Sequence, residues 1–237
     1  MHRFTSLLML SACGGADLGV QTDAIVGGRS DRTHHAVGLV GVTTDTGWAF
    51  FCSGTLVGPT TVLTAAHCLF DGDRRLTART LVFATDDAVF DVARSSVAPG
   101  YDPEAYADWE DAAFLRLDFA PEVAPIPVRS AEPEVGDRAT VVGFGVTSGW
   151  SGEGFGERRR VDVRLSEVTA RELTYDGEDG GACYGDSGGP VLVDGRVVGV
   201  TSRSYGRGCR GLEVAQRADV LVRWLRRDRG DVCVEDC

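Results

Sequence analysis

The chain has 237 residues and a formal net charge of −11, from 24 basic and 35 acidic side chains. This acidic balance argues against nucleic acid as a partner, because the phosphate backbone would be repelled. No run approaches the ~18 consecutive apolar residues of a membrane-spanning helix. The 31 glycines separate many short apolar runs, which favours an all-β protein with tight turns over a helical one.

Residues 1–12 have the pattern of a signal peptide, with Arg3 as a positive start and a short apolar stretch from Phe4 to Ala12. The segment from Leu10 to Cys13 resembles a bacterial lipobox, in which Cys13 is lipidated and becomes the mature N-terminus. An ordinary secretory signal and a mis-assigned start codon are the alternatives. We therefore expect an extracytoplasmic protein, secreted or lipid-anchored to a bacterial membrane, with a propeptide over 13–24.

Two polar side chains in the first half stand at the edges of apolar, strand-like runs. His67 follows the run from Leu63 to Ala66, and Asp111 leads directly into a second apolar run. A carboxylate that is buried and faces an imidazole is expected at the edge of an apolar strand, as Asp111 is. Glu110 and Asp108 are neighbouring rivals, but the strand phase and the apolar run that follows favour Asp111.

The proline-rich stretch 121–127 is typical of a linker. Strand-like segments follow at 140–144, 191–193 and 196–200, and the Asp194-Gly195 pair predicts a tight hairpin turn. One helix is expected near the end of the chain, over 217–227. Its apolar side chains would lie on one face: Val220, Leu221, Trp224 and Leu225.

Ser187 lies on a glycine-flanked turn, in the run Cys183-Tyr184-Gly185-Asp186-Ser187-Gly188-Gly189-Pro190. A serine hydroxyl is a poor nucleophile until a nearby base takes its proton, so a serine and a histidine matter as a pair. The chain order His67, Asp111, Ser187 differs from the orders found in subtilisins and α/β-hydrolases. It resembles that of the chymotrypsin-fold, trypsin-like serine proteases.

This resemblance runs from Ile25 to about Leu225. It implies an all-β fold of two six-stranded antiparallel barrels, about 28–119 and 135–214, within a protease domain over 25–237. The active site would lie in the cleft between the barrels. The motifs that carry the resemblance are Ile25-Val26-Gly27-Gly28, Cys52-Ser53-Gly54-Thr55-Leu56-Val57, Leu63 to Cys68, Asp111 to Leu117, Gly143-Phe144-Gly145 and Cys183 to Pro190.

The resemblance also implies a role for each residue of the site. Ser187 would be the nucleophile, His67 the general base and Asp111 the group that orients the base. The backbone N–H groups of Gly185 and Ser187 would form the oxyanion hole. Ser202, 15 residues after Ser187, would support the aspartate, and Ser204 is the alternative register.

Asp186 is expected to be buried beside the nucleophile, where a lone carboxylate needs a partner. The resemblance supplies one in the α-amino group of Ile25, freed by cleavage after Ala24. The protein would then be a precursor that needs an activating protease. That protease could not have trypsin specificity, because Ala24 is not basic.

The chain has 7 cysteines. The resemblance pairs Cys52 with Cys68 and Cys183 with Cys209, while Cys233 and Cys237 can close a small terminal loop. Cys13 is then the odd residue, as lipidation predicts, although a propeptide disulfide from Cys13 to a C-terminal cysteine is an alternative. Either arrangement implies an oxidising compartment. Zinc is not expected, because no Cys-x-x-Cys spacing occurs.

The substrate pocket departs from a simple trypsin pattern. Gly181, followed by Ala182, stands where trypsin-like enzymes place a pocket aspartate. Glu213 could enter the pocket from the side and accept Arg or Lys while leaving room for large apolar side chains, or it could be a solvated loop residue. Arg203 could favour acidic substrate residues or point to solvent. Ser204 is a further candidate for the pocket.

We interpret the chain as a serine endopeptidase that works through an acyl-enzyme, without cofactor or metal. Its partners would be protein or peptide substrates and an activating protease, with no nucleic acid, and membrane attachment would occur only through a lipid on Cys13. We expect a monomer. The alternative is a catalytically silent binding protein on the same fold.

Overall fold

The structure is a computed structural model that describes residues 25–104, 110–227 and 231–237. The predicted signal peptide, the propeptide and the lipidation of Cys13 fall on residues outside these ranges. Among the described residues, no helix combines the length and the apolar character needed to cross a membrane.

The described residues form short strands joined by turns, with a single α-helix, α1, at Val222–Arg227. Short 3₁₀ helices lie at His67–Leu69, Ala78–Thr80 and Asp219–Leu221. The strands are β1 Arg29–Ser30, β2 Val37–Thr44, β3 Gly47–Leu56, β4 Thr61–Thr64, β5 Phe70–Asp71, β6 Arg74–Arg75, β7 Leu81–Ala84, β8 Val89–Val97, β9 Ala113–Leu117, β10 Arg138–Gly143, β11 Arg159–Val168, β12 Glu172–Asp176, β13 Pro190–Val193, β14 Arg196–Gly206 and β15 Gly211–Arg217.

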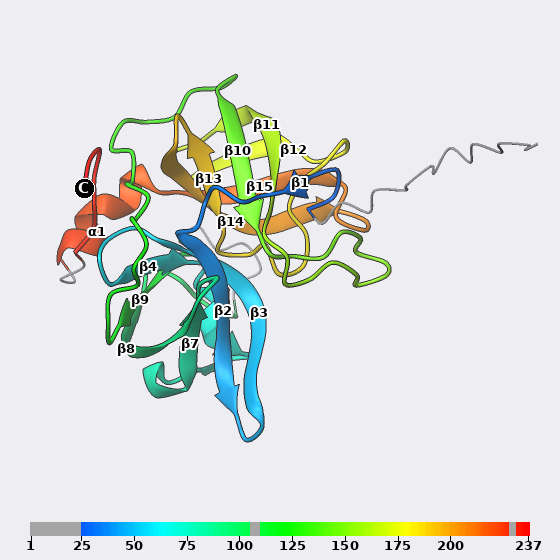
Figure 1. Cartoon of the computed structure of the whole chain (residues 1–237). Helices are drawn as coiled ribbons and strands as arrows, with labels where there is room; N and C mark the ends of the chain where they lie inside the picture. The colour runs from blue at the N-terminus through cyan, green and yellow to red at the C-terminus, as the bar shows by residue number, and fades with distance from the viewer. Residues whose placement is uncertain (1–24, 105–109, 228–230) are drawn as a thin grey trace, which may run out of the picture.

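Two antiparallel barrels make up the molecule (Figure 1). The first closes in the order β2-β3-β4-β9-β8-β7. The second runs β11-β10-β13-β14-β15-β12 and closes because β12 pairs back onto β11, while β1 adds an extra strand at the β11 edge. This confirms the predicted fold class of two six-stranded barrels with one short C-terminal helix.

The hairpin between β13 and β14 follows its sequence signal. Asp194 and Gly195 have φ angles of 50° and 73°, and Val193 pairs with Arg196 across the turn. Positive φ at both central residues matches the twist of the flanking strands, which is why the Asp-Gly pair suits this position.

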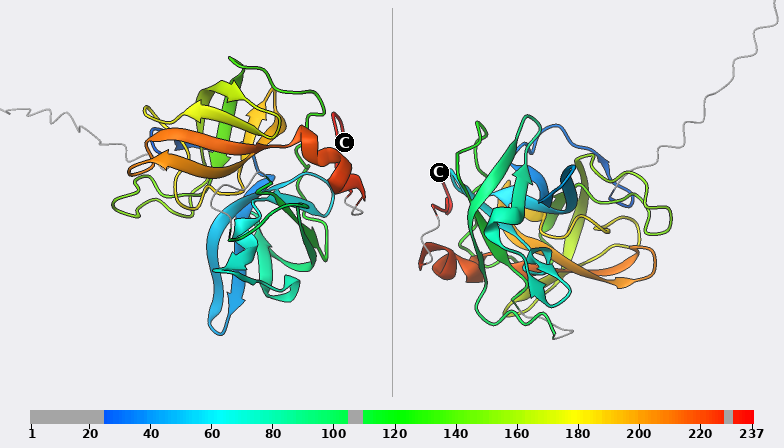
Figure 2. Two further views of the ribbon diagram at one scale, coloured as in Figure 1. Left: turned by 180° about the vertical axis from the view of Figure 1, so that it is seen from behind. Right: turned by 90° about the horizontal axis from the view of Figure 1, so that it is seen from below.

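The two barrels share an apolar core. Leu56 and Leu63 of the first barrel belong to the same buried cluster as Val142 and Leu192 of the second. The chain end returns to this cluster, because Leu225 of α1 is fully buried in it and the ring of Trp224 packs on Phe114, 5.4 Å between centroids. Figure 2 shows α1 at the flank of the molecule, beside both barrels.

The C-terminal helix is shorter than the sequence predicts. Arg217 is the last residue of β15, where its strand partner is Gly199, and a 3₁₀ turn precedes α1. Leu221 is buried as expected, but the Val220 side chain is 42% exposed. The tighter 3₁₀ spacing turns Val220 away from the apolar face that an α-helix would have given it.

Three disulfides join residues of the described segments: Cys52–Cys68, Cys183–Cys209 and Cys233–Cys237. This is the pairing that the resemblance and the terminal spacing imply. The first bond ties β3 to the turn that carries His67, and the second ties the Ser187 segment to the β14–β15 loop. Such bonds persist in oxidising compartments, so they fit an extracytoplasmic protein.

Candidate active site

His67 and Asp111 meet because strand pairing brings their segments together. Thr64 at the end of β4 pairs with Ala113 at the start of β9, so the residues just beyond this pair are neighbours. Nδ1 of His67 lies 2.8 Å from Oδ2 of Asp111, and the backbone N–H of His67 donates to Oδ1 at 2.9 Å. The carboxylate therefore fixes both the position and the rotation of the imidazole.

A third group reaches the same carboxylate from the second barrel. The hydroxyl of Ser202 donates to Oδ2 of Asp111 at 2.6 Å. The register between β14 and β15 shifts between Thr201 and Arg203, so Ser202 is the extra residue of a β-bulge. A bulge re-aims a side chain, and here it directs the Ser202 hydroxyl toward Asp111. Ser204, the alternative register, instead donates to Glu213 at 2.8 Å.

The rival carboxylates are placed elsewhere or not described. Oε1 of Glu110 accepts from the guanidinium of Arg171 at 2.5 Å, so this side chain forms an ion pair with the second barrel. Asp108 lies outside the described residues. Of the two acids that the structure describes at this point, Asp111 is the one in contact with His67.

His67 and Asp111 each favour the charged form of the other. Burial opposes a charge on His67, but the hydrogen bond and charge of Asp111 outweigh it and raise the pKa of the imidazole above its ordinary value of 6.5. Burial likewise opposes a charge on Asp111, but the hydrogen bond and charge of His67, with the Ser202 hydroxyl, lower the pKa of that carboxyl. The His67 side chain is 40% exposed and Asp111 is 7% exposed.

Ser187 lies on a tight turn whose backbone needs glycine. Gly185 has a φ of 99°, and a Cβ added there would lie 2.6 Å from the ring of Phe155. Gly188 has a φ of 84° and would meet Thr64 Oγ1 at 2.1 Å. Side chains are therefore excluded at both positions on conformational and steric grounds. The carbonyl oxygen of Ser187 accepts the N–H of Ser53 at 2.8 Å.

Asp186 is fully buried beside Ser187. Its two carboxylate oxygens accept the backbone N–H groups of Gly145 at 2.7 Å and Cys183 at 2.8 Å. A Cβ on Gly143 or Gly145 would lie within 2.5 Å of this carboxylate, which explains why glycine occurs at both places. Burial raises the pKa of Asp186 to about 7, although the two N–H groups oppose the rise.

Ile25 and Val26 anchor the start of the described chain in the second barrel. The Ile25 side chain is 0% exposed, and Val26 forms a β-bridge with Gly181. Ile25 has a φ of 50°, which is strained for a β-branched residue.

A pocket of about 260 Å³ opens beside Ser187, lined among others by Ala182, Ser202, Arg203, Ser204 and Glu213. The Cys183–Cys209 disulfide contributes to its wall.

Glu213 lies on β15 and is 1% exposed, so it is not a solvated loop residue. A Cβ on Gly181 would lie 3.1 Å from Glu213 Cγ, and one on Gly177 would lie 2.9 Å from it. The Glu213 side chain thus occupies the space that a side chain at position 181 would need. Burial raises the pKa of Glu213 to about 7, and the charge of Asp186 adds to the rise against the Ser204 hydrogen bond.

The Arg203 side chain lines the pocket and does not simply point to solvent. Its guanidinium donates to Oε1 of Glu172 at 2.7 Å and to the hydroxyl of Tyr205 at 3.0 Å, and its side chain is 24% exposed. The buried carboxylate of Glu172 on β12 holds it, because β15 pairs with both strands and its Val214 lies opposite both Arg203 and Thr174, two residues from Glu172.

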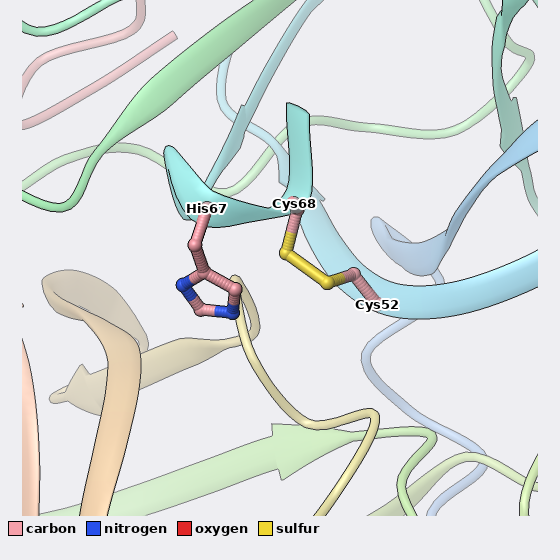
Figure 3. Close-up of side chains that lie close together, drawn as sticks. All are labelled: Cys52, His67 and Cys68. Atoms are coloured by element: carbon pink, nitrogen blue, oxygen red, sulfur yellow. A yellow bond between two sulfur atoms is a disulfide. The ribbon is translucent and has the colours of Figure 1, made fainter. Parts of the chain in front are cut away.

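Cys52, His67 and Cys68 form the one close group of three metal-ligating residue types within the described ranges. Figure 3 shows His67 and Cys68 projecting from the same short turn, with the Cys52–Cys68 disulfide beside the imidazole. A disulfide sulfur has no thiolate to offer, so this group does not fit a zinc site.

Sequence reasoning missed two residues at this site. Ser53 follows Cys52 and reads only as part of a strand, and Phe155 lies in a glycine-rich loop. Their contacts with the Ser187 turn depend on how the two barrels and the loop pack, which no local pattern encodes.

The fold of two antiparallel barrels with a short C-terminal helix is chymotrypsin-like. The model of the trypsin family matches residues 25–225, so the chain belongs to that family. A trypsin from Saccharopolyspora erythraea is 30% identical, over 78% of this chain and 88% of that protein. Brachyurin from Leptuca pugilator is 29% identical, over 76% of this chain and 88% of that protein.

Solved structures agree in fold. Human heparin binding protein superposes with a TM-score of 0.71 at 26% identity, covering 86% of this chain and 96% of that one. Neuropsin from mouse brain superposes with a TM-score of 0.73 at 21% identity, covering 86% and 99%.

Proposed function

We propose that the protein is a serine endopeptidase in which Ser187 attacks the carbonyl carbon of a substrate peptide bond. The observation that carries this proposal is the hydrogen-bonded chain from Ser202 through Asp111 to His67, beside the pocket that Ser187 lines. Membership of the trypsin family supports it.

The reaction follows from the placement of protons. Nε2 of His67 takes the proton of the Ser187 hydroxyl as its oxygen attacks, then gives it to the leaving amine, so the peptide bond breaks and an acyl-serine remains. Water then attacks the acyl carbon while His67 takes one of its protons, and His67 gives that proton to the Ser187 oxygen as the bond to the acyl group breaks and the carboxylic acid product leaves. Asp111 keeps Nδ1 protonated and stabilises the imidazolium formed at each attack.

The N–H groups of Gly185 and Ser187 would stabilise the oxygen that becomes negative in each tetrahedral intermediate. The positive φ of Gly185 supports this assignment, because it is the backbone conformation that a side chain would oppose. No cofactor is needed for these steps.

We further propose that cleavage before Ile25 activates a precursor whose signal peptide is 1–12 and whose propeptide is 13–24. The new α-amino group would pair with the buried carboxylate of Asp186. The positive φ of Ile25 supports a cut at this bond, because cleavage removes the conformational restraint on a residue whose strain costs about 1–3 kcal/mol.

Glu213 is proposed to accept an Arg or Lys side chain of the substrate. It occupies the space beside Gly181, and Ser204 holds its carboxylate. Because Gly181 and Ala182 are small, large apolar side chains would also fit in the pocket.

The protease domain is proposed to act outside the cytoplasm as a monomer, secreted or attached through a lipid on Cys13, on protein or peptide substrates. The alternative is a silent binding protein on the same fold. One solved structure of similar fold is that of human heparin binding protein, which supports keeping this alternative.

Labelling with a fluorophosphonate probe tests the proposal. We expect label on protein processed to begin at Ile25, and none on Ser187→Ala or on the precursor. Label on precursor and processed protein alike would remove the activation step. No label on folded, processed protein would favour the binding protein.

A further inference from the structure

Ser53 of the first barrel reaches into the turn that carries Ser187. It lies on β3, directly after Cys52, and is 0% exposed. All of its polar atoms have partners. Its N–H donates to the carbonyl of Ser187 at 2.8 Å, and its own carbonyl accepts the hydroxyl of Thr64 at 2.8 Å.

The Ser53 hydroxyl bridges two backbone groups of the second barrel. It donates to the carbonyl oxygen of Gly185 at 2.8 Å and accepts the N–H of Phe144 at 3.1 Å. Phe144 precedes Gly145, whose N–H holds the Asp186 carboxylate. One hydroxyl therefore joins the Gly185 carbonyl to the segment that holds Asp186.

The carbonyl that Ser53 holds belongs to the peptide between Gly185 and Asp186. The peptide unit before it carries the N–H of Gly185, and the peptide unit after it carries the N–H of Ser187. Its own N–H, that of Asp186, donates to Cys183 at 2.9 Å, so both its ends are fixed. Because a peptide unit is planar and rigid, holding its orientation restricts the directions that the two flanking N–H groups can take.

Besides the bond from the Asp186 N–H, the Ser53 hydroxyl is the side-chain group that holds this peptide, at its carbonyl end. A glycine with a φ of 99° has wide conformational freedom, and its Cα borders the ring of Phe155, which makes no hydrogen bond. Loss of the Ser53 hydroxyl would leave the Gly185 carbonyl and the Phe144 N–H buried without this partner. Buried polar groups favour conformations that restore a partner, so the peptide, then held only through its N–H, would turn its carbonyl toward another donor.

We propose that Ser53 is a positioning residue for the oxyanion hole, which its hydroxyl aligns from the opposite barrel. This rests on the proposed function, because the hole has a role only if Ser187 is the nucleophile. Ser53 touches no reacting atom, so its effect is on the stabilisation of the tetrahedral oxyanion and not on substrate binding.

The test compares Ser53→Ala and Ser53→Gly with wild type, all processed to begin at Ile25. Loss of a whole oxyanion donor costs about 10²–10³-fold in kcat, and a misaligned donor should cost less, about 10- to 100-fold, with KM within about twofold. Ser53→Thr keeps a hydroxyl and should recover most of the loss. Thr61→Val is the matched control: it removes a fully buried hydroxyl of the same barrel, one that donates to Asp231.

A second measurement separates alignment from general loosening. A peptide aldehyde forms a tetrahedral oxyanion on the serine, whereas the matching peptide alcohol does not. We expect Ser53→Ala to weaken the aldehyde about 10-fold or more relative to the alcohol, and Thr61→Val to leave this ratio unchanged.

An unchanged ratio in both Ser53 variants, or an equal change in Thr61→Val, overturns the proposal. If wild type itself fails to take up the fluorophosphonate probe, the proposed function fails first. If wild type is labelled while the Ser53 variants match it in kcat and in the inhibitor ratio, only the role of Ser53 is refuted.

Discussion

The charge of Glu213 should make substrate preference depend on pH in the neutral range. Burial raises the pKa of this carboxyl to about 7, well above its ordinary 4.5. Such a group is about 10% ionised near pH 6 and about 90% ionised near pH 8. If the ionised form binds an Arg side chain, preference for Arg rises about ninefold over this range.

The assay compares two peptide substrates that differ only in Arg against citrulline, its neutral isostere, at the residue that enters the pocket. Both reactions need neutral His67, so its titration cancels in the ratio of their kcat/KM values. We expect this ratio to rise about ninefold between about pH 6 and pH 8 with a midpoint near 7.

Glu213→Gln supplies the matched variant, because it keeps the side-chain shape and the hydrogen bond with Ser204. It should abolish the pH dependence of the ratio. It should also lower the preference for Arg by about 10-fold or more, since hydrogen bonds to charged groups contribute about 1.5–3 kcal/mol. A ratio that stays flat with pH in wild type, or that Glu213→Gln leaves unchanged, refutes the contact between Glu213 and the substrate.

Three further predictions concern the same site. Asp111→Asn should lower kcat by about 10⁴-fold, the loss established for this family's own aspartate. It should also shift the lower midpoint of the pH–rate profile downward, because the Asp111 carboxylate raises the pKa of His67 above 6.5. An unmoved midpoint would argue against the interaction between Asp111 and His67. In the Ser187→Ala precursor, folded Asp186 keeps a proton that the unfolded chain has released, so urea denaturation should show stability falling between about pH 4 and pH 7, with a contribution from Asp186 of about 4 kcal/mol at most. Asp186→Asn should remove this contribution and reduce the slope, and an equal slope in the variant would contradict the raised pKa of Asp186. Gly181→Asp should impair folding or activity, because the new carboxylate would crowd that of Glu213. The double variant Gly181→Asp with Glu213→Gly should restore cleavage after Arg, and its preference for Arg over citrulline should no longer titrate with a midpoint near pH 7. Peptide profiling of both variants tests this.

The fold class and the residues from which a triad could be built can be recognised in the amino-acid sequence alone. Short apolar runs, glycine turns and the motifs around His67, Asp111 and Ser187 are local patterns, so they can be recognised without knowing which strands pair. The same holds for the Asp194-Gly195 turn, whose φ angles depend on two residues.

Which side chains meet across the barrels can be seen only once the chain is folded. The bulge at Ser202, the pairing of Arg203 with Glu172, the burial of Glu213 and the reach of Ser53 to Gly185 each depend on strand register and barrel closure. The length of α1 also depended on β15 continuing to Arg217. A shift of one residue turns a strand side chain to the opposite face, so these contacts follow from pairing between distant segments and not from the local sequence.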